Sequence, residues 1–67
     1  MSNVFERIKE LRLEKNLTQT ELAKATGISQ NAIAQWENRK RTPNIFAVIT
    51  LSRYFEFTTD YLLGEKD

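Results

Sequence analysis

The stretch LTQTELAKATGISQNAIAQWEN, residues 17–38, decides the fold, because it carries the signals for two short helices and the turn between them. Thr18 and Glu21 have the spacing of a capping box, in which the hydroxyl accepts from a free backbone N–H and the carboxylate reaches back. This pair predicts a helix from Gln19 to about Thr26.

A tight turn follows this helix. Gly27 has no Cβ and accepts the left-handed backbone that follows a helix end, so we expect the helix to stop there. Ser29 is placed to cap another helix that begins at Gln30, only two residues later. Two helices joined by so short a turn must cross at a steep angle.

Apolar periodicity predicts three further helices and no strand. One covers about 3–15, with Asn16 suited to end it, and one covers 45–55 behind a Pro-Asn pair. A short fifth helix is capped by Thr58. The apolar residues of these helices are Val4, Phe5, Ile8, Leu11, Ile45, Val48, Ile49, Leu51, Phe55, Tyr61, Leu62 and Leu63. The expected fold is all-α, a compact five-helix bundle that forms one domain over residues 1–67.

Composition excludes several classes of function. The 67 residues include no Cys and no His, so disulfides, zinc sites of the usual ligand set and nucleophile–His catalysis are unavailable. Glu6, Glu10 and Glu14 recur along the first helix, but they interleave with lysines as on an ordinary solvated face. We expect no enzymatic activity, no cofactor, no metal and no small-molecule substrate.

The location of the protein follows from its N-terminus and its apolar runs. The first sixteen residues, MSNVFERIKELRLEKN, are charged throughout, and no apolar run approaches the roughly 20 residues that a membrane span needs. We therefore expect a cytoplasmic protein without membrane contact. The net charge is only +1, so the distribution of the charges is more informative than their sum.

The helix that begins at Gln30 has an unusual polar side. At about 100° per residue, one side carries Ala32, Ile33 and Trp36, and the other carries Gln30, Asn31, Ala34 and Gln35. Carboxamides offer a donor and an acceptor together, as base edges in the major groove do, and an alanine suits the thymine methyl. The alternative is an uncharged solvated face. For Trp36 we favour the core over base stacking.

Three cations, Arg39, Lys40 and Arg41, follow this helix directly. They lie in a loop beside the groove that the helix would enter, so they are candidates for phosphate contacts. Gln19 is another candidate, because its side chain and the free N–H groups at its helix start can face an anion. Taken alone, three cations more often mark a solvated loop, but the adjacent amide face favours phosphate binding.

The run LTQTELAKATGISQNAIAQWENRKRTPN resembles the helix-turn-helix of the phage-repressor and Cro family, also called XRE-like. The resemblance extends from about Phe5 to Leu63, and the helix-turn-helix covers about 18–37. It is carried by Leu17, Thr18, Gln19, Glu21, Leu22, Ala23, Gly27, Ile28, Ser29, Ile33, Trp36, Glu37, Asn38, Pro43, Asp60, Tyr61, Leu62 and Leu63. It implies a lambda-repressor-like bundle whose second helix crosses the DNA backbone and whose third helix enters the major groove.

The resemblance also implies roles for single residues. Gln30, Asn31 and Gln35 would reach bases, and Gln19 and Asn38 would reach phosphates. Ala34 joins this set because it lies on the same polar side of the helix. The candidate base contacts are therefore Gln30, Asn31, Ala34 and Gln35. The candidate phosphate contacts are Gln19, Ser29, Asn38, Arg39, Lys40 and Arg41.

The implied function is sequence-specific binding of double-stranded DNA by a transcriptional regulator, most readily a repressor that binds a palindromic operator as a homodimer. Occlusion of a promoter and contact with polymerase both remain open as mechanisms. The alternative is the same fold used as a protein-interaction module, such as an antitoxin or a coactivator-like domain. Strong salt dependence of binding to duplex DNA would favour the regulator.

Two charged residues fit a structural role better than a binding one. Arg12 falls between Phe5 and Ile8 on the first helix, and Glu37 lies beside Ile33, so each charge borders an apolar face. We expect these two residues to pair, and the family resemblance implies the same salt bridge. Replacing Arg12 should therefore cost stability rather than change sequence preference.

The chain departs from the family pattern at three positions. Arg39 and Glu56 stand where family members often have Gly, so both are expected to adopt a left-handed backbone. Phe46, at a position that is usually polar, is predicted to point away from the core, as is Tyr54. We expect Phe46, with Phe57 or Tyr61, to form a two-fold dimer contact. The alternative is that these rings fold over the core of their own chain.

Overall fold

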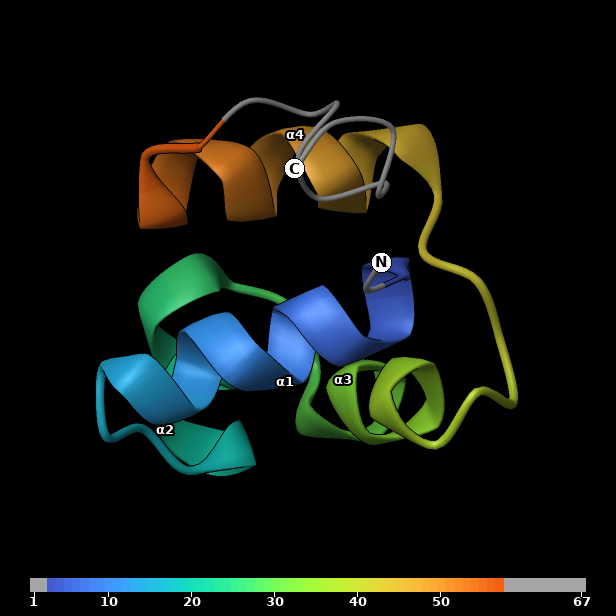
Figure 1. Ribbon diagram of the computed structural model, residues 1–67, viewed down its shortest axis with the longest axis horizontal. Helices are drawn as coiled ribbons and strands as arrows, with labels where there is room; N and C mark the ends of the chain where they lie inside the picture. Colours follow the sequence, from blue (N-terminus) through green and yellow to red (C-terminus); the bar gives the residue numbers. More distant parts are fainter. Residues whose placement is uncertain (1–2, 58–67) are drawn as a thin grey trace.

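The computed structural model of the protein describes residues 3–57, whose regular elements are four α-helices. They are α1 (Val4–Glu14), α2 (Gln19–Thr26), α3 (Gln30–Glu37) and α4 (Ile45–Phe55). In Figure 1, α4 lies across the top, α2 and α3 lie below, and α1 crosses between them. The all-α prediction is confirmed for this range. The predicted fifth helix, with Tyr61, lies outside the described residues.

Each of the four helices begins at a residue whose side chain caps it. Asn3, Thr18, Ser29 and Asn44 all accept a hydrogen bond from the backbone N–H three residues later. The predicted capping box is present, since Thr18 Oγ1 accepts from the Glu21 N–H at 3.1 Å and the Thr18 N–H donates to Glu21 Oε1 at 2.8 Å. A cap of this kind contributes about 1 kcal/mol to helix stability. Nothing in these helices is long and apolar enough to cross a membrane.

The helices end at residues with a left-handed backbone. The φ angle is 57° at Asn16, 79° at Gly27, and 62° at both Arg39 and Glu56. The expectation that Arg39 and Glu56 adopt this conformation is therefore confirmed. A residue with a Cβ costs roughly 1–2 kcal/mol in this region. Three helix ends, at Asn16, Arg39 and Glu56, consequently carry a side chain where glycine would avoid the strain, and asparagine tolerates this backbone best of the three.

Within residues 3–57, one apolar cluster lies between the helices. It consists of Val4, Ile8, Leu11, Leu22, Ile33, Trp36, Ala47, Val48, Leu51 and Phe55. Trp36 belongs to this core, as the sequence predicts. α3 packs against both α1 and α2, and α2 also contacts α4. The helix that the family resemblance places in the major groove, α3, is therefore held on two sides.

The structure corrects two predictions about α4. Ile45, which was predicted to be buried, is 57% exposed because it is the first residue of the helix and lies ahead of the core. Tyr54, which was predicted to face outward, is half-buried against the core. Its ring makes an edge contact with Phe55, and its centroid lies 5.6 Å from Nζ of Lys15, the residue that follows α1. Phe46 is 76% exposed, as predicted.

Candidate nucleic-acid interface

The amide-bearing side of α3 faces away from the core. Ile33 and Trp36 anchor the helix by burial, whereas Gln30 and Asn31 at its start are exposed. The other two candidate base contacts, Ala34 and Gln35, are half-buried. All four therefore lie outside the buried cluster.

The side chain of Gln19 joins the starts of α2 and α3. Gln30 Nε2 donates to Gln19 Oε1 at 2.8 Å, and Gln19 Nε2 donates to Glu37 Oε1 at 3.2 Å. Gln19 was expected to contact phosphate, and it still has a second amide hydrogen with which to do so. The expectation missed its two protein contacts, because they span the turn between the helices.

Arg12 and Glu37 form the expected salt bridge between α1 and the last residue of α3. Arg12 Nε donates to Glu37 Oε2 at 2.7 Å and Arg12 Nη2 donates to Glu37 Oε1 at 2.9 Å, which is a bidentate pair. Arg12 Nη1 also donates to the carbonyl oxygen of Leu17 at 2.7 Å. The side chains are only 10% and 3% exposed. Hydrogen bonding to Glu37 raises the pKa of Arg12 above its usual value, against the lowering effect of burial.

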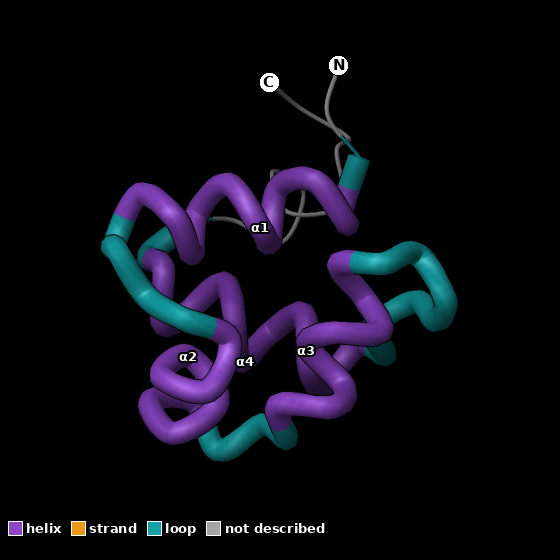
Figure 2. The backbone as a smooth tube through the Cα atoms, turned by 90° about the horizontal axis from the view of Figure 1, so that it is seen from below, coloured by secondary structure: helices purple, strands orange, loops and turns teal. Residues whose placement is uncertain are grey.

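The connection from α3 to α4 begins with a Schellman turn. The Lys40 N–H donates to the Gln35 carbonyl at 2.8 Å and the Arg39 N–H donates to the Trp36 carbonyl at 3.0 Å, so the left-handed residue is Arg39. Figure 2 shows this connection as the teal loop at the right, beside the start of α1. The turn fixes the backbone from which the three cations project.

Arg39 pairs with a carboxylate of α1 within the described residues. Arg39 Nη2 donates to Glu6 Oε1 at 3.0 Å, and the two side chains are 57% and 47% exposed. Lys40, Arg41 and Asn38 are also exposed. The Arg39–Glu6 pair was not predicted from the sequence, because the two residues lie 33 positions apart and neither borders a recognisable apolar face.

Gln30 and Asn31 lie at the start of α3, and the three cations follow its other end. At 1.5 Å per residue an eight-residue helix is about 12 Å long, comparable to the width of the major groove. Ser29, at the amide end, uses its hydroxyl oxygen to accept from the Ala32 N–H at 3.1 Å, which leaves the hydroxyl hydrogen to donate. The arrangement suits a helix that enters a groove while its flanks meet the two phosphate backbones.

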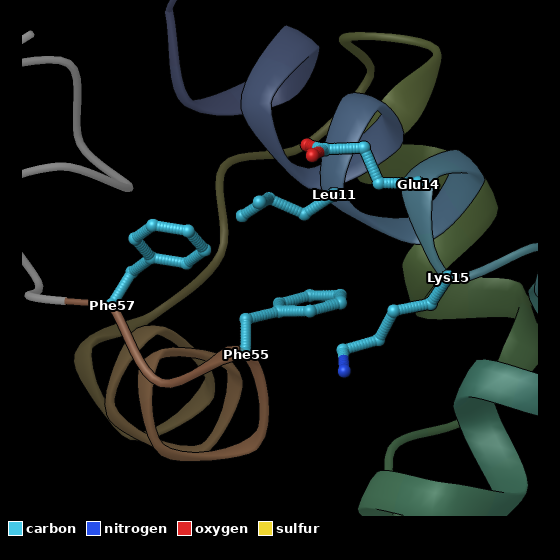
Figure 3. Close-up of a pocket in the computed structure, with 5 residues that line it drawn as sticks. All are labelled: Leu11, Glu14, Lys15, Phe55 and Phe57. Carbon is cyan, nitrogen blue, oxygen red and sulfur yellow. The ribbon is translucent and has the colours of Figure 1, made fainter.

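The aromatic residues expected at a dimer contact are not brought together. Phe46 and Phe57 are 76% and 44% exposed, but Phe46 is near the start of α4 and Phe57 lies beyond its end. Between Phe46 and its last residue, Phe55, α4 rises by about 14 Å, so the two rings lie at opposite ends of the helix. Figure 3 shows Phe57 beside Phe55 and Leu11 at a pocket of about 270 Å³ that Glu14 and Lys15 also line. Tyr61 lies outside the described residues.

The fold and this surface together define the class of the domain: α2, the turn at Gly27 and α3 form a helix-turn-helix. The family model described as Helix-turn-helix, HTH_3, matches residues 8–62, and the chain belongs to this family.

Two relatives of this chain are transcriptional regulators, which is consistent with the helix-turn-helix family. The chain is 39% identical over 62 residues to the HTH-type transcriptional activator BcrR of Enterococcus faecalis, covering 92% of this chain and 30% of the relative. It is 38% identical over 58 residues to repressor protein C2 of Salmonella phage P22, covering 87% of this chain and 27% of that protein. The chain thus spans about a third or less of these curated relatives.

A solved structure matches the whole fold. The P22 c2 repressor protein, in complex with synthetic operator 9T in the presence of Tl⁺, superposes with a TM-score of 0.87 at 33% identity. The match covers 98% of this chain and 100% of the other.

Proposed function

We propose that this chain is a sequence-specific, double-stranded DNA-binding domain of a transcriptional regulator and that it acts as a repressor. The observation that carries the proposal is the uncharged amide side of α3, which is exposed at Gln30 and Asn31 while Ile33 and Trp36 anchor the opposite side. The likeness of this chain, over 98% of its residues, to a phage repressor solved in complex with a synthetic operator supports it. The domain acts in the cytoplasm and needs no cofactor or enzymatic activity for this role.

In this proposal α3 reads bases from the major groove. Gln30, Asn31 and Gln35 pair with base edges through amides that both donate and accept, and Ala34 contacts a thymine methyl. The half-burial of Ala34 and Gln35 places them at the margin of the surface, so Gln30 and Asn31 carry most of the base reading.

Phosphate contacts position the helix. Asn38, Lys40 and Arg41 are exposed at one end of α3, and Ser29 and Gln19 retain hydrogens to donate at the other. Arg39 also contacts phosphate once its side chain releases Glu6. These contacts set the register on the duplex and confer salt dependence rather than sequence preference.

Selection of bound duplexes from a random DNA pool at moderate salt tests the proposal. We expect one enriched inverted repeat, and we expect Gln30→Ala to relax the preference at one symmetric pair of positions. Lys40→Ala should weaken binding to all duplexes and reduce the salt slope by about one contact. Lys9→Ala removes the same charge from the exposed face of α1 and is the matched control. No enrichment at any salt would overturn DNA reading and favour a protein partner for the amide side.

We further propose that two copies bind one operator, with an exposed aromatic residue in the contact between them. Because Phe46 and Phe57 lie at opposite ends of α4, Phe46→Glu and Phe57→Glu test separate faces. Sedimentation with the selected duplex should give two chains per duplex for the wild type. One variant should bind with lower cooperativity and identify the face, and wild-type behaviour of both would exclude these rings.

A further inference from the structure

A series of side chains connects the buried ion pair to the exposed amide of Gln30. Arg12 holds both oxygens of Glu37, and Glu37 Oε1 also accepts from Gln19 Nε2 at 3.2 Å. Gln19 Oε1 then accepts from Gln30 Nε2 at 2.8 Å. The Glu37 side chain is only 3% exposed, so one end of the series is buried and the other end is at the surface.

The chemistry of Glu37 determines how the two amides must be oriented. A carboxylate paired with a guanidinium only accepts hydrogen bonds, and Arg12 donates to both oxygens of Glu37. The Gln19 group that faces Glu37 must therefore be the NH₂, which turns its oxygen toward Gln30. Gln30 in turn must present its own NH₂ to that oxygen. The orientation follows from donors and acceptors and does not depend on distinguishing N from O by position.

We propose that Glu37 is a positioning residue that sets the base preference of Gln30 through Gln19. With one amide hydrogen committed to Gln19, Gln30 retains one N–H and its oxygen. These two groups match adenine, whose major-groove edge offers the N7 acceptor and the N6 donor. Guanine offers two acceptors, N7 and O6, and so is disfavoured. This inference rests on the proposed reading of bases by α3.

Loss of the carboxylate should remove the preference by freeing the amides. If residue 37 can donate as well as accept, Gln19 can turn by 180° and present its NH₂ to Gln30. Gln30 would then accept through its oxygen and have both amide hydrogens available for acceptors such as those of guanine. The ion pair thus has a consequence for specificity in addition to its role in stability.

The test compares the wild type, Glu37→Gln and Arg12→Lys on two duplexes that differ at one base pair. The duplex is the operator selected by the wild type, with A·T or G·C at the position that Gln30→Ala relaxes. We expect the wild type to prefer adenine by roughly tenfold or more, the discrimination typical of a bidentate pair. Glu37→Gln should reduce this ratio at least threefold while the ratio at the position read by Gln35 stays unchanged.

Arg12→Lys is the matched control. It weakens the same ion pair but leaves the carboxylate that orients Gln19, so the adenine ratio should be retained. All variants are compared at a temperature where circular dichroism shows them folded. If Glu37→Gln does not fold, Gln19→Met interrupts the series without touching the ion pair and should reduce the same ratio.

Two results would count against the inference in different ways. An equal loss of affinity for both duplexes in Glu37→Gln and Gln19→Met, with the ratio retained, would show a structural role alone and overturn it. Failure of the wild type to bind any selected duplex would overturn the proposed DNA binding, and this inference with it.

Discussion

Two arginine–glutamate pairs join α1 to the C-terminal end of α3, and they differ in almost everything except their charges. The Arg12–Glu37 pair is bidentate, at 2.7 and 2.9 Å, and its side chains are 10% and 3% exposed. The Arg39–Glu6 pair has one hydrogen bond of 3.0 Å and side chains that are 57% and 47% exposed. Burial and geometry, rather than charge, determine which pair supports the fold.

The two pairs also place their charges differently. α1 contributes the arginine to the buried pair and the glutamate to the exposed one. Within the buried pair both charges are compensated and withdrawn from solvent. In the exposed pair, Glu6 holds Arg39, a cation that the proposed function assigns to phosphate. In that proposal the carboxylate would compete with DNA for Arg39, so the exposed pair would affect affinity while the buried pair supports the fold.

The largest expected effect comes from breaking the buried pair. Arg12→Ala leaves Glu37 buried without its cation and should lower the free energy of unfolding by about 3 kcal/mol. This is a large share of the total for a domain of this size. Denaturant unfolding followed by circular dichroism measures the loss, and Lys9→Ala on the exposed face of α1 should change little. An unchanged melting curve for Arg12→Ala would contradict the structural role.

Glycine substitutions at two left-handed helix ends, Glu56 and Arg39, separate backbone strain from the contribution of the exposed pair. Glu56→Gly removes a left-handed side chain without touching either pair and should stabilise the protein by about 1 kcal/mol. Arg39→Gly relieves the same backbone strain but also removes the exposed pair. Because an exposed pair contributes less than about 1 kcal/mol, Arg39→Gly should still be neutral or stabilising. A marked loss of stability in Arg39→Gly would mean that the exposed pair is stronger than its geometry indicates.

Glu6→Gln separates stability from affinity. It should change the free energy of unfolding by less than about 0.5 kcal/mol, yet raise affinity for all duplexes roughly two- to fivefold by releasing Arg39. The salt slope should steepen by nearly one phosphate contact. Glu14→Gln makes the same charge change elsewhere on α1. An equal gain in Glu14→Gln would show an effect of net charge and no competition for Arg39.

The smallest expected effect concerns a carboxylate whose partner is local. Hydrogen bonding with the backbone and hydroxyl of Thr18 lowers the pKa of Glu21 below its ordinary value. A lowered pKa in the folded state means that the contribution to stability is present above about pH 4.5 and is lost as the pH falls through the folded value. Glu21→Gln should therefore reduce stability at neutral pH and flatten this part of the acid dependence. Unfolding curves at pH 7 and pH 3 measure both, and parallel losses at the two values would contradict the assignment.

Local signals in the sequence determined the helices. Thr18 and Gly27 predict the limits of α2, and the structure has both. The left-handed backbone at Arg39 and Glu56, which the structure also contains, was expected from the family resemblance rather than from local signals. The two limits of α2 each involve residues within about five positions of one another, so a single stretch of chain contains all the physical information. The core position of Trp36 follows from the same helical periodicity.

Only the tertiary structure decided how distant side chains meet. The Gln19–Glu37, Arg12–Glu37 and Arg39–Glu6 contacts span 18, 25 and 33 positions, and each depends on the crossing of helices. Periodicity placed Arg12 and Glu37 beside apolar faces and so indicated their pairing. It held no such information for Glu6 or for the second contact of Gln19. Likewise it placed Ile45 in the stripe of α4, where the packing leaves that residue exposed, because a helical wheel gives direction around an axis but not where along that axis the core ends.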